Sequence, residues 1–211
     1  MYPYYILVFA PMLFSMLHFK GQSVQRRKQQ SIKLFFILLF ILLALRGISI
    51  GKDTSNYLYL FNNYAERDWS AVFSSSTEPA FVILNKIVSV FSNNFQWLLV
   101  TAAAITIIPF YYQYAKNSED PVLTIALFIT MSTFIMLFSG IRQGIAIALG
   151  LIAFEFTRRK KLLGFIFIVV LAILFHTSAF MLIFMYPLYH VQITKKWLLA
   201  VIPAMIVIFA F

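Results

Sequence analysis

Apolar segments alternate with short polar stretches along the whole chain, and this pattern predicts helices that cross a membrane. A helix needs about 20 mainly apolar residues to span a bilayer, and the chain offers such stretches one after another. We therefore expect an all-α, polytopic transmembrane helical bundle of about eight spans. These would form a single integral membrane domain over residues 1–211. The expected spans are Met1–Phe19, Leu34–Ile50, Phe95–Tyr114, Val122–Phe138, Ile141–Phe156, Leu162–Phe175, Ser178–His190 and a last run that ends at Phe211.

One apolar segment, Ala80–Phe91, differs from the others because it is short and contains Asn85, Lys86 and Ser89. It is too short and too polar for an ordinary span, which needs about 20 apolar residues. We expect it to be a re-entrant or interfacial helix on the outer side of the membrane. The polar stretch before it, residues 51–79, is then the main outer loop.

The basic residues set the predicted orientation, because cytoplasmic loops carry an excess of Lys and Arg. Two groups are expected inside, and they consist of Lys20, Arg26, Arg27, Lys28 and Lys33, and of Arg158, Arg159, Lys160 and Lys161. Lys195 and Lys196 are expected on the same side. The N-terminus is then outside. The first span is retained, because it lacks the basic start and the cleavage site of a signal peptide.

Composition agrees with a membrane protein and excludes a soluble one. The chain is 62% hydrophobic and 11% charged, whereas soluble domains average about 45–50% and about 25%. The net charge of +10 would suggest nucleic acid in a soluble protein, but here the positive residues sit in short loops. We therefore expect membrane lipids, and no nucleic acid, around this chain. Cysteine is absent, which excludes disulfides and a thiol nucleophile.

The expected topology places four ionisable residues from distant parts of the chain on one outer face, namely Asp53, Glu78, Arg142 and His176. Charged groups cost roughly 2.5–3.5 kcal/mol at the centre of a membrane helix and tend to face cavities or one another. A functional site at this face is therefore the leading hypothesis. The alternative is that Arg142 only snorkels to lipid phosphates and that His176 only ends a helix.

Four motifs in this region resemble the EpsG family, which is related to Wzy-type polysaccharide polymerases. In the family's order they are Gly51–Tyr57 (GKDTSNY), Glu78–Phe81 (EPAF), Ser139–Ala146 (SGIRQGIA) and Phe175–Ala179 (FHTSA). The resemblance implies a polymerase that assembles exopolysaccharide or capsule from undecaprenyl-diphosphate-linked oligosaccharide repeats at the outer face of a bacterial plasma membrane. Other polysaccharide-assembly proteins would be its partners. Family members are usually longer, so a C-terminal truncation is one interpretation of the ending at Phe211.

A polymerase of this kind needs cations for the departing diphosphate, and Arg142 fits that role. A guanidinium binds phosphate oxygens as a planar fork, and the helix start beside Arg142 adds free N–H donors. Gln143 is expected either to donate alongside it or to make a simple interfacial hydrogen bond. Arg46 is a further candidate phosphate contact, with snorkelling to lipid headgroups as the alternative.

His176 is the predicted general base, because the accepting hydroxyl loses a proton as it attacks and imidazole is suited to proton transfer near neutral pH. Ser178 or Thr177 is expected to orient the ring, unless these residues only cap the next helix. Asp53 is a catalytic candidate as orienter or alternative base. Its plainer interpretation is a solvated residue or a helix cap after a glycine turn.

Tyr57 and Glu78 are the remaining predicted substrate contacts. Tyr57 follows Asp53 by four residues and shares its face if the loop is helical, and its ring can stack on a sugar. Glu78 is expected to orient the acceptor. The alternative for Glu78 is an acid that only favours the N-terminus of the helix beginning at Pro79.

The chain contains no Asp-x-Asp, Walker or His-Glu-x-x-His motif, so we expect metal-independent glycosyl transfer without a cofactor. No cytoplasmic segment is large enough to bind a nucleotide sugar, which favours a lipid-linked donor. A transporter or flippase of lipid-linked oligosaccharides is the second hypothesis, although no inverted repeat is evident. A membrane O-acyltransferase is the third.

Overall fold

The computed structural model describes residues 2–16, 23–72 and 74–192, together with positions 194, 197, 201, 203 and 205. These residues form an all-α fold, which confirms the predicted secondary-structure class. The predictions for Lys20, Lys195 and Lys196, and for most of the last apolar run, lie outside the described residues.

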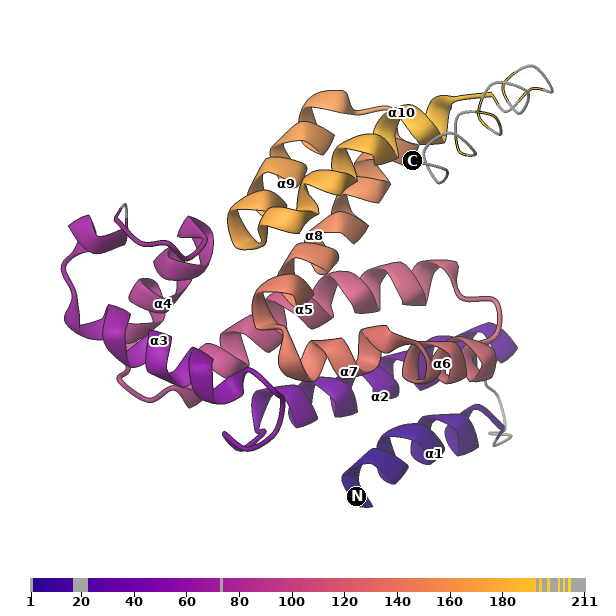
Figure 1. The fold of residues 1–211 in the computed structure, drawn as a ribbon. Coiled ribbons are helices and arrows are strands. Elements are labelled where there is room, and N and C mark those ends of the chain that lie inside the picture. The colour runs from indigo at the N-terminus through magenta and orange to yellow at the C-terminus, as the bar shows by residue number, and fades with distance from the viewer. Residues whose placement is uncertain are drawn as a thin grey trace.

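Ten α-helices and two 3-10 helices make up the described part of the chain (Figure 1). In chain order they are α1 (Tyr2–Met16), α2 (Val24–Ala44), α3 (Thr54–Glu66), η1 (Trp69–Val72), α4 (Pro79–Phe91), α5 (Gln96–Asn117), α6 (Pro121–Thr130), α7 (Ser132–Ser139), α8 (Ile141–Arg158), α9 (Leu162–Phe175), η2 (Thr177–Phe184) and α10 (Met185–His190).

The helices form three groups in space (Figure 1). Helices α2 and α5 run antiparallel to each other, and α1 and α6 pack along α2. Helices α3 and α4 form a lobe near the N-terminal end of α5. Helix α8 crosses α5 and continues into a second layer, where it packs against α9, η2 and α10.

The predicted turn between α8 and α9 is the feature that brings distant motifs together. The two helices are joined by three basic residues, of which Lys160 has a left-handed backbone with φ 55°. A Cβ at Gly164 would lie 2.4 Å from ring carbons of Phe156, so glycine allows the two helices to approach closely. The hairpin therefore places the end of α9 beside the start of α8.

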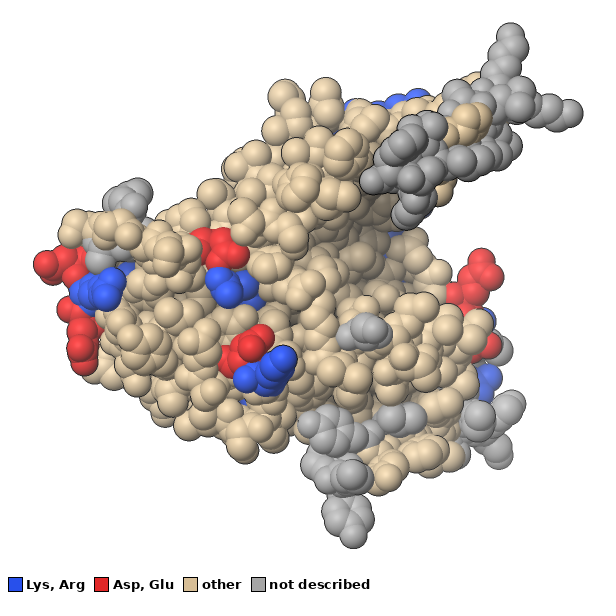
Figure 2. Space-filling model, viewed as in Figure 1, with Lys and Arg blue, Asp and Glu red and all other residues tan. Residues whose placement is uncertain are grey.

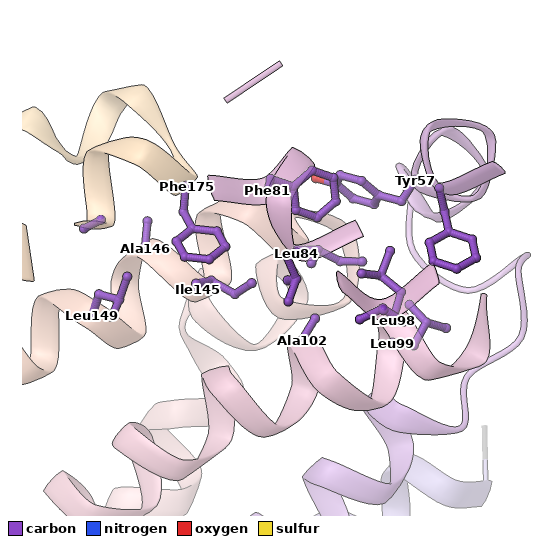
Figure 3. Packing of buried hydrophobic residues seen from close by; sticks show 14 of the residues in the cluster. Tyr57, Phe81, Leu84, Leu98, Leu99, Ala102, Ile145, Ala146, Leu149 and Phe175 are labelled. Atoms are coloured by element: carbon purple, nitrogen blue, oxygen red, sulfur yellow. The ribbon is translucent and has the colours of Figure 1, made fainter. Parts of the chain in front are cut away.

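A hydrophobic cluster lies where α3, α4, α5, α8 and α9 meet. Its buried side chains include Tyr57, Phe81, Leu98, Ile145 and Phe175, and Figure 3 shows how they converge from separate helices. Helices in a bilayer are held together mainly by van der Waals packing, which these close contacts supply. The cluster fixes the positions of the four segments that carry the polar motifs.

The predicted single span Val122–Phe138 is wrong in its continuity. It consists of α6 and α7, which are bent by 56° across a break next to Met131. The Thr130 hydroxyl donates to the carbonyls of Ala126 (2.8 Å) and Leu127 (3.3 Å). Such bonds from Thr back to its own helix are associated with bending.

Other predicted boundaries also shift. Leu34–Ile50 is replaced by α2, which begins at Val24 because the Ser23 hydroxyl caps it by accepting from the Arg26 backbone N–H (3.3 Å). The basic residues after Ser23 are therefore helical and do not form a loop. Ser178–His190 is likewise not one continuous α-helix, since η2 precedes the short α10. The predicted outer loop 51–79 contains α3 and η1.

Among the described residues, α5 is the one helix that is both long and apolar enough to cross a membrane alone. Helix α6 together with Thr133–Ser139 is a second candidate if the bent pair forms one span. Helices α4 and α9 are apolar but shorter. Helix α8 has the length, but it carries Arg142, Glu155 and Arg158 near its ends. Length and composition of the helices therefore support one or two of the predicted spans.

Candidate functional site

The carboxylate of Glu78 joins three side chains from distant parts of the chain. Its Oε2 atom accepts a hydrogen bond from the Arg142 guanidinium, with which it forms an ion pair. Its Oε1 atom lies 3.3 Å from Nδ1 of His176. The Thr177 hydroxyl donates to the same Oε1 atom over 3.3 Å. Glu78 is thus the centre of a polar cluster, which we call the Glu78 cluster: Glu78, Arg142, His176 and Thr177.

Each member of the Glu78 cluster sits at the end of a helix. Glu78 immediately precedes α4, whose first residue is Pro79, and its side chain makes no capping hydrogen bond there. Arg142 is the second residue of α8, and His176 follows the last residue of α9. Helix ends gather here because the hydrophobic cluster beneath them packs α4 against α9 and α8 against α9.

The Glu78 cluster is only partly shielded from solvent. The side chain of Glu78 is 14% exposed, whereas those of Arg142 and His176 are 27% and 28% exposed. The partly buried carboxylate is thus covered by two side chains that remain accessible. A polar ligand can reach Arg142 and His176 without opening the hydrophobic core.

Several opposing effects act on the pKa of Glu78. Burial alone would raise it, because it disfavours the charged form. The backbone N–H of Glu78, the charge and hydrogen bond of Arg142, and the backbone N–H of Thr177 favour the charged form and outweigh burial. The pKa of Glu78 therefore lies below its ordinary value, and the group is an anion at neutral pH.

Tyr57 and Phe81 hold Arg142 from below. The Arg142 guanidinium carbon lies 5.9 Å from the centre of each ring, which is within cation–π range. The two rings meet edge to face with their centres 5.4 Å apart. Tyr57 is 3% exposed, so its ring lies against Arg142 and Phe81 and not on an open surface where a sugar stacks. The sequence predicts that Tyr57 contacts a sugar, whereas in the structure its ring contacts Arg142.

Asp53 lies at the start of α3 but outside the Glu78 cluster. It is exposed, and its side chain does not cap α3. Within the described residues, no hydrogen bond or ion pair joins Asp53 to Glu78, Arg142 or His176. The structure therefore brings Arg142 and His176 together and leaves the third predicted catalytic residue apart.

The backbone before Asp53 nevertheless docks onto the junction between α7 and α8. Gly51 has φ +93°, and a Cβ there would lie 1.8 Å from the Phe138 carbonyl oxygen. The backbone N–H of Lys52 donates to the Ser139 hydroxyl over 3.2 Å. The first and third sequence motifs are thus in direct contact through Lys52 and Ser139, which lie one residue before Asp53 and three residues before Arg142.

The remaining predicted contacts are distributed differently. Gln143 and Ser178 are exposed, and Gln143 is turned by about 100° from Arg142 around α8. His176, and not Ser178, occupies the N-cap position of η2, so Ser178 does not cap this helix.

Arg46 is 5% exposed and donates to the Leu137 carbonyl over 3.2 Å. It turns into the protein, so the snorkelling interpretation of Arg46 is wrong.

Sequence reasoning missed the link that Glu78 makes between Arg142 and His176. The partners lie 64 and 98 residues away, and no spacing rule connects such positions. Thr177 was considered only beside the imidazole or as a cap, but its hydroxyl reaches Glu78. The indication in the sequence was that an acidic residue, Glu78, stands directly before Pro79. Its side chain makes no capping hydrogen bond to α4 and can therefore bind other groups. Among the described residues, no group of three or more His, Asp or Glu side chains could hold a metal ion.

The opposite ends of α5 and α8 carry a second polar group. Glu155 pairs with Lys116 (2.8 Å), Arg158 (3.5 Å) and Arg159 (2.8 Å). In the face that Figure 2 shows, charged side chains gather near the α3–α4 lobe and at the opposite edge, with uncharged surface between them. The Lys28 ammonium also donates to the Glu119 carbonyl, which joins the start of α2 to the α5–α6 connection.

The family model described as the EpsG family matches residues 31–211, a range that includes all four motifs and the whole Glu78 cluster. No curated protein matches, and no solved structure matches.

Proposed function

The chain belongs to the EpsG family, which implies a role in exopolysaccharide synthesis, and from that premise we propose that it joins lipid-linked oligosaccharide repeats into a polymer. The donor is a growing glycan on undecaprenyl diphosphate, and the acceptor is a sugar hydroxyl on the next lipid-linked repeat. The observation that carries this proposal is the shared carboxylate. Glu78 holds a permanent cation, Arg142, and an imidazole, His176, on its two oxygens.

Arg142 is the group that binds the leaving diphosphate. A guanidinium has five N–H donors, and Glu78 accepts from only one of its terminal nitrogens. Tyr57 also makes a hydrogen bond with this guanidinium. The side chain is 27% exposed, so its remaining terminal N–H groups can donate to phosphate oxygens. The position of Arg142 in the first turn of α8 adds backbone N–H groups and the positive end of the helix dipole.

His176 is the group that takes the proton. When Nδ1 carries a hydrogen and donates it to Glu78, Nε2 is left as the acceptor. The acceptor hydroxyl gives its proton to Nε2 as its oxygen forms the new bond to the sugar carbon. The bond between that carbon and the diphosphate oxygen breaks, and its electron pair leaves with undecaprenyl diphosphate. Glu78 stabilises the imidazolium that forms, as an orienting carboxylate does in other catalytic arrangements.

The positions of the two polar groups support a multi-pass protein of the bacterial plasma membrane. The start of α2, the end of α5 and the end of α8 are joined by Lys28, Lys116 and Arg158 with their partners. Lys28 and Arg158 belong to the basic segments that the positive-inside rule assigns to the cytoplasm, and the end of α5 lies beside them. The Glu78 cluster lies at the other ends of α8 and α9, so it faces outside. About eight spans and an external N-terminus remain part of this proposal.

The test is polymer formation in vesicles that contain the purified chain and lipid-linked repeat units. We expect Arg142→Lys and His176→Gln to reduce chain extension by about 10²–10⁴-fold, because each removes a group that acts in the transition state. Arg26→Lys and His190→Gln are matched controls, since both lie outside the Glu78 cluster, and they should extend like the unmodified chain. Full extension by the His176 variant at every pH would remove it as the base. Unchanged donor affinity in the Arg142 variant would remove the diphosphate role.

A further inference from the structure

A cavity of about 340 Å³ lies between α5 and α8, at the ends of these helices away from the Glu78 cluster. In Figure 1 the two helices lie close near the start of α8 and separate towards their C-terminal ends. The wall is mainly apolar and is formed by Ile108, Pro109, Tyr112, Ile152 and Phe156. The polar residues at its edge are Gln113, Glu155, Arg159 and Lys161.

The charged edge of this cavity has an excess of cations. Glu155 is its only carboxylate among the described lining residues, and that group already pairs with Lys116 and with Arg159, each at 2.8 Å. Lys161 lines the cavity and has no ion pair among the described residues. Arg159 keeps further donors after bonding one Glu155 oxygen, because guanidinium has five. An anion that reaches this edge therefore meets Arg159 and Lys161 as a pair.

We propose that this cavity binds one anionic phospholipid of the cytoplasmic leaflet. An acyl chain lies along the apolar wall, and the lipid phosphate accepts from Arg159 and Lys161. The volume falls within the range of about 300–1,000 Å³ that is usual for small-molecule sites. The inference shares only the membrane location with the proposed function and needs no glycosyl transfer.

The positive-inside rule alone accounts for basic residues in the α8–α9 turn, but it treats them as equivalent. The cavity distinguishes them. Arg159 and Lys161 line it, whereas Lys160, which lies between them in sequence, does not. A topological role predicts the same effect for each neutralised charge. A lipid site predicts that Arg159 and Lys161 matter and that Lys160 does not.

The test is a binding titration of the purified full chain, freed of native lipid, followed by native mass spectrometry. The probes are phosphatidylglycerol, phosphatidylcholine and glycerol 3-phosphate. We expect saturable binding of phosphatidylglycerol, about tenfold weaker binding of phosphatidylcholine and no saturable binding of glycerol 3-phosphate. The double variant Arg159→Gln/Lys161→Gln should bind phosphatidylglycerol about tenfold more weakly, whereas Lys160→Gln should stay within about twofold.

Equal affinity for the two phospholipids would overturn the proposal, as would a double variant that binds like the unmodified chain. Binding of glycerol 3-phosphate as tight as that of phosphatidylglycerol would make this a phosphate site and overturn the lipid assignment. The comparison of probes needs no variant, so it decides even if the double variant does not fold. Glu78→Gln should bind phosphatidylglycerol normally, which separates this site from polymer formation.

Discussion

Glu78 and His176 are separated by 98 residues, and yet Oε1 of one lies 3.3 Å from Nδ1 of the other. The same carboxylate also pairs with Arg142 through its second oxygen. A charge that holds two side chains can fix the tautomer of the imidazole and the direction of the guanidinium together. The role of Glu78 in such a site is therefore positioning, and its loss should affect both partners.

Replacing Glu78 with Gln tests this positioning role. The amide keeps the size of the side chain but removes the charge, so it binds Arg142 less well and does not stabilise a protonated His176. We expect chain extension to fall by up to about 10²–10⁴-fold, the usual value of general-base assistance. Glu78→Asp keeps the charge and should recover part of the loss. Extension by Glu78→Gln at the unmodified rate would show that the carboxylate is not needed.

Acid should weaken the fold through the same residue. The pKa of Glu78 is lowered in the folded chain, so the ionised form is favoured by folding. Its stabilising contribution is therefore complete above the ordinary pKa of a carboxyl group and is lost as the pH falls through the lowered value. Thermal unfolding in detergent should show a constant difference between the unmodified chain and Glu78→Gln at neutral pH. The difference should close in acid, and a difference independent of pH would contradict the shift.

Gly51 should be intolerant of any side chain. Its φ of +93° disfavours other residues, and a Cβ would meet the Phe138 carbonyl at 1.8 Å, where a backbone atom has to move. We expect Gly51→Ala to lower the free energy of unfolding by more than about 1–2 kcal/mol, since the left-handed backbone alone costs that much. Gly47→Ala is the control, because its Cβ would meet nothing within 4 Å. Equal melting temperatures for the two variants would argue against the docked loop.

The orientation of the chain can be measured by cysteine labelling, because the sequence has no cysteine of its own. Asn56→Cys is exposed near the start of α3, and Lys160→Cys is exposed in the α8–α9 turn. We expect an impermeant thiol reagent applied to intact cells to label the first position. The second should react only after the membrane is permeabilised. The reverse pattern would invert the proposed topology.

Part of the site follows from the sequence, and the α8–α9 turn shows why. Two apolar segments joined by the basic residues 158–161 have to pack as an antiparallel hairpin, so the start of one and the end of the other must meet. This is how Arg142 and His176 could be expected on the same side. The motif at Gly51 likewise predicts a tight turn from local sequence alone, because a left-handed backbone favours glycine.

Features that depend on packing between distant helices did not follow from the sequence. The position of Glu78 depends on how Phe81 packs against Tyr57, and no periodicity encodes that contact. The burial of Arg46 depends on α7 lying close enough for its Leu137 carbonyl to accept, whereas a single sequence suggests only an arginine near a helix end. The hydropathy of the sequence does not reveal the break between α6 and α7. Both helices are apolar, so the mean hydropathy of the segment is the same whether it is straight or bent.

Tyr57 provides the last test, because the sequence predicts that its ring stacks on a substrate sugar and the structure places the ring against Arg142. The guanidinium carbon lies 5.9 Å from the ring centre, and a cation–π contact of this kind is worth about 0.5–2 kcal/mol. Tyr57→Phe keeps the ring but removes the hydroxyl that hydrogen-bonds Arg142, so it should lose a small part of the donor affinity, whereas Tyr57→Leu should lose more. If the ring acts through Arg142, then Tyr57→Leu and Arg142→Lys share one interaction. Their effects in the double variant should then be non-additive by more than about 0.5 kcal/mol. A ring that stacks on sugar independently of Arg142 would instead give effects that add, and donor affinities measured for the four chains distinguish the two cases.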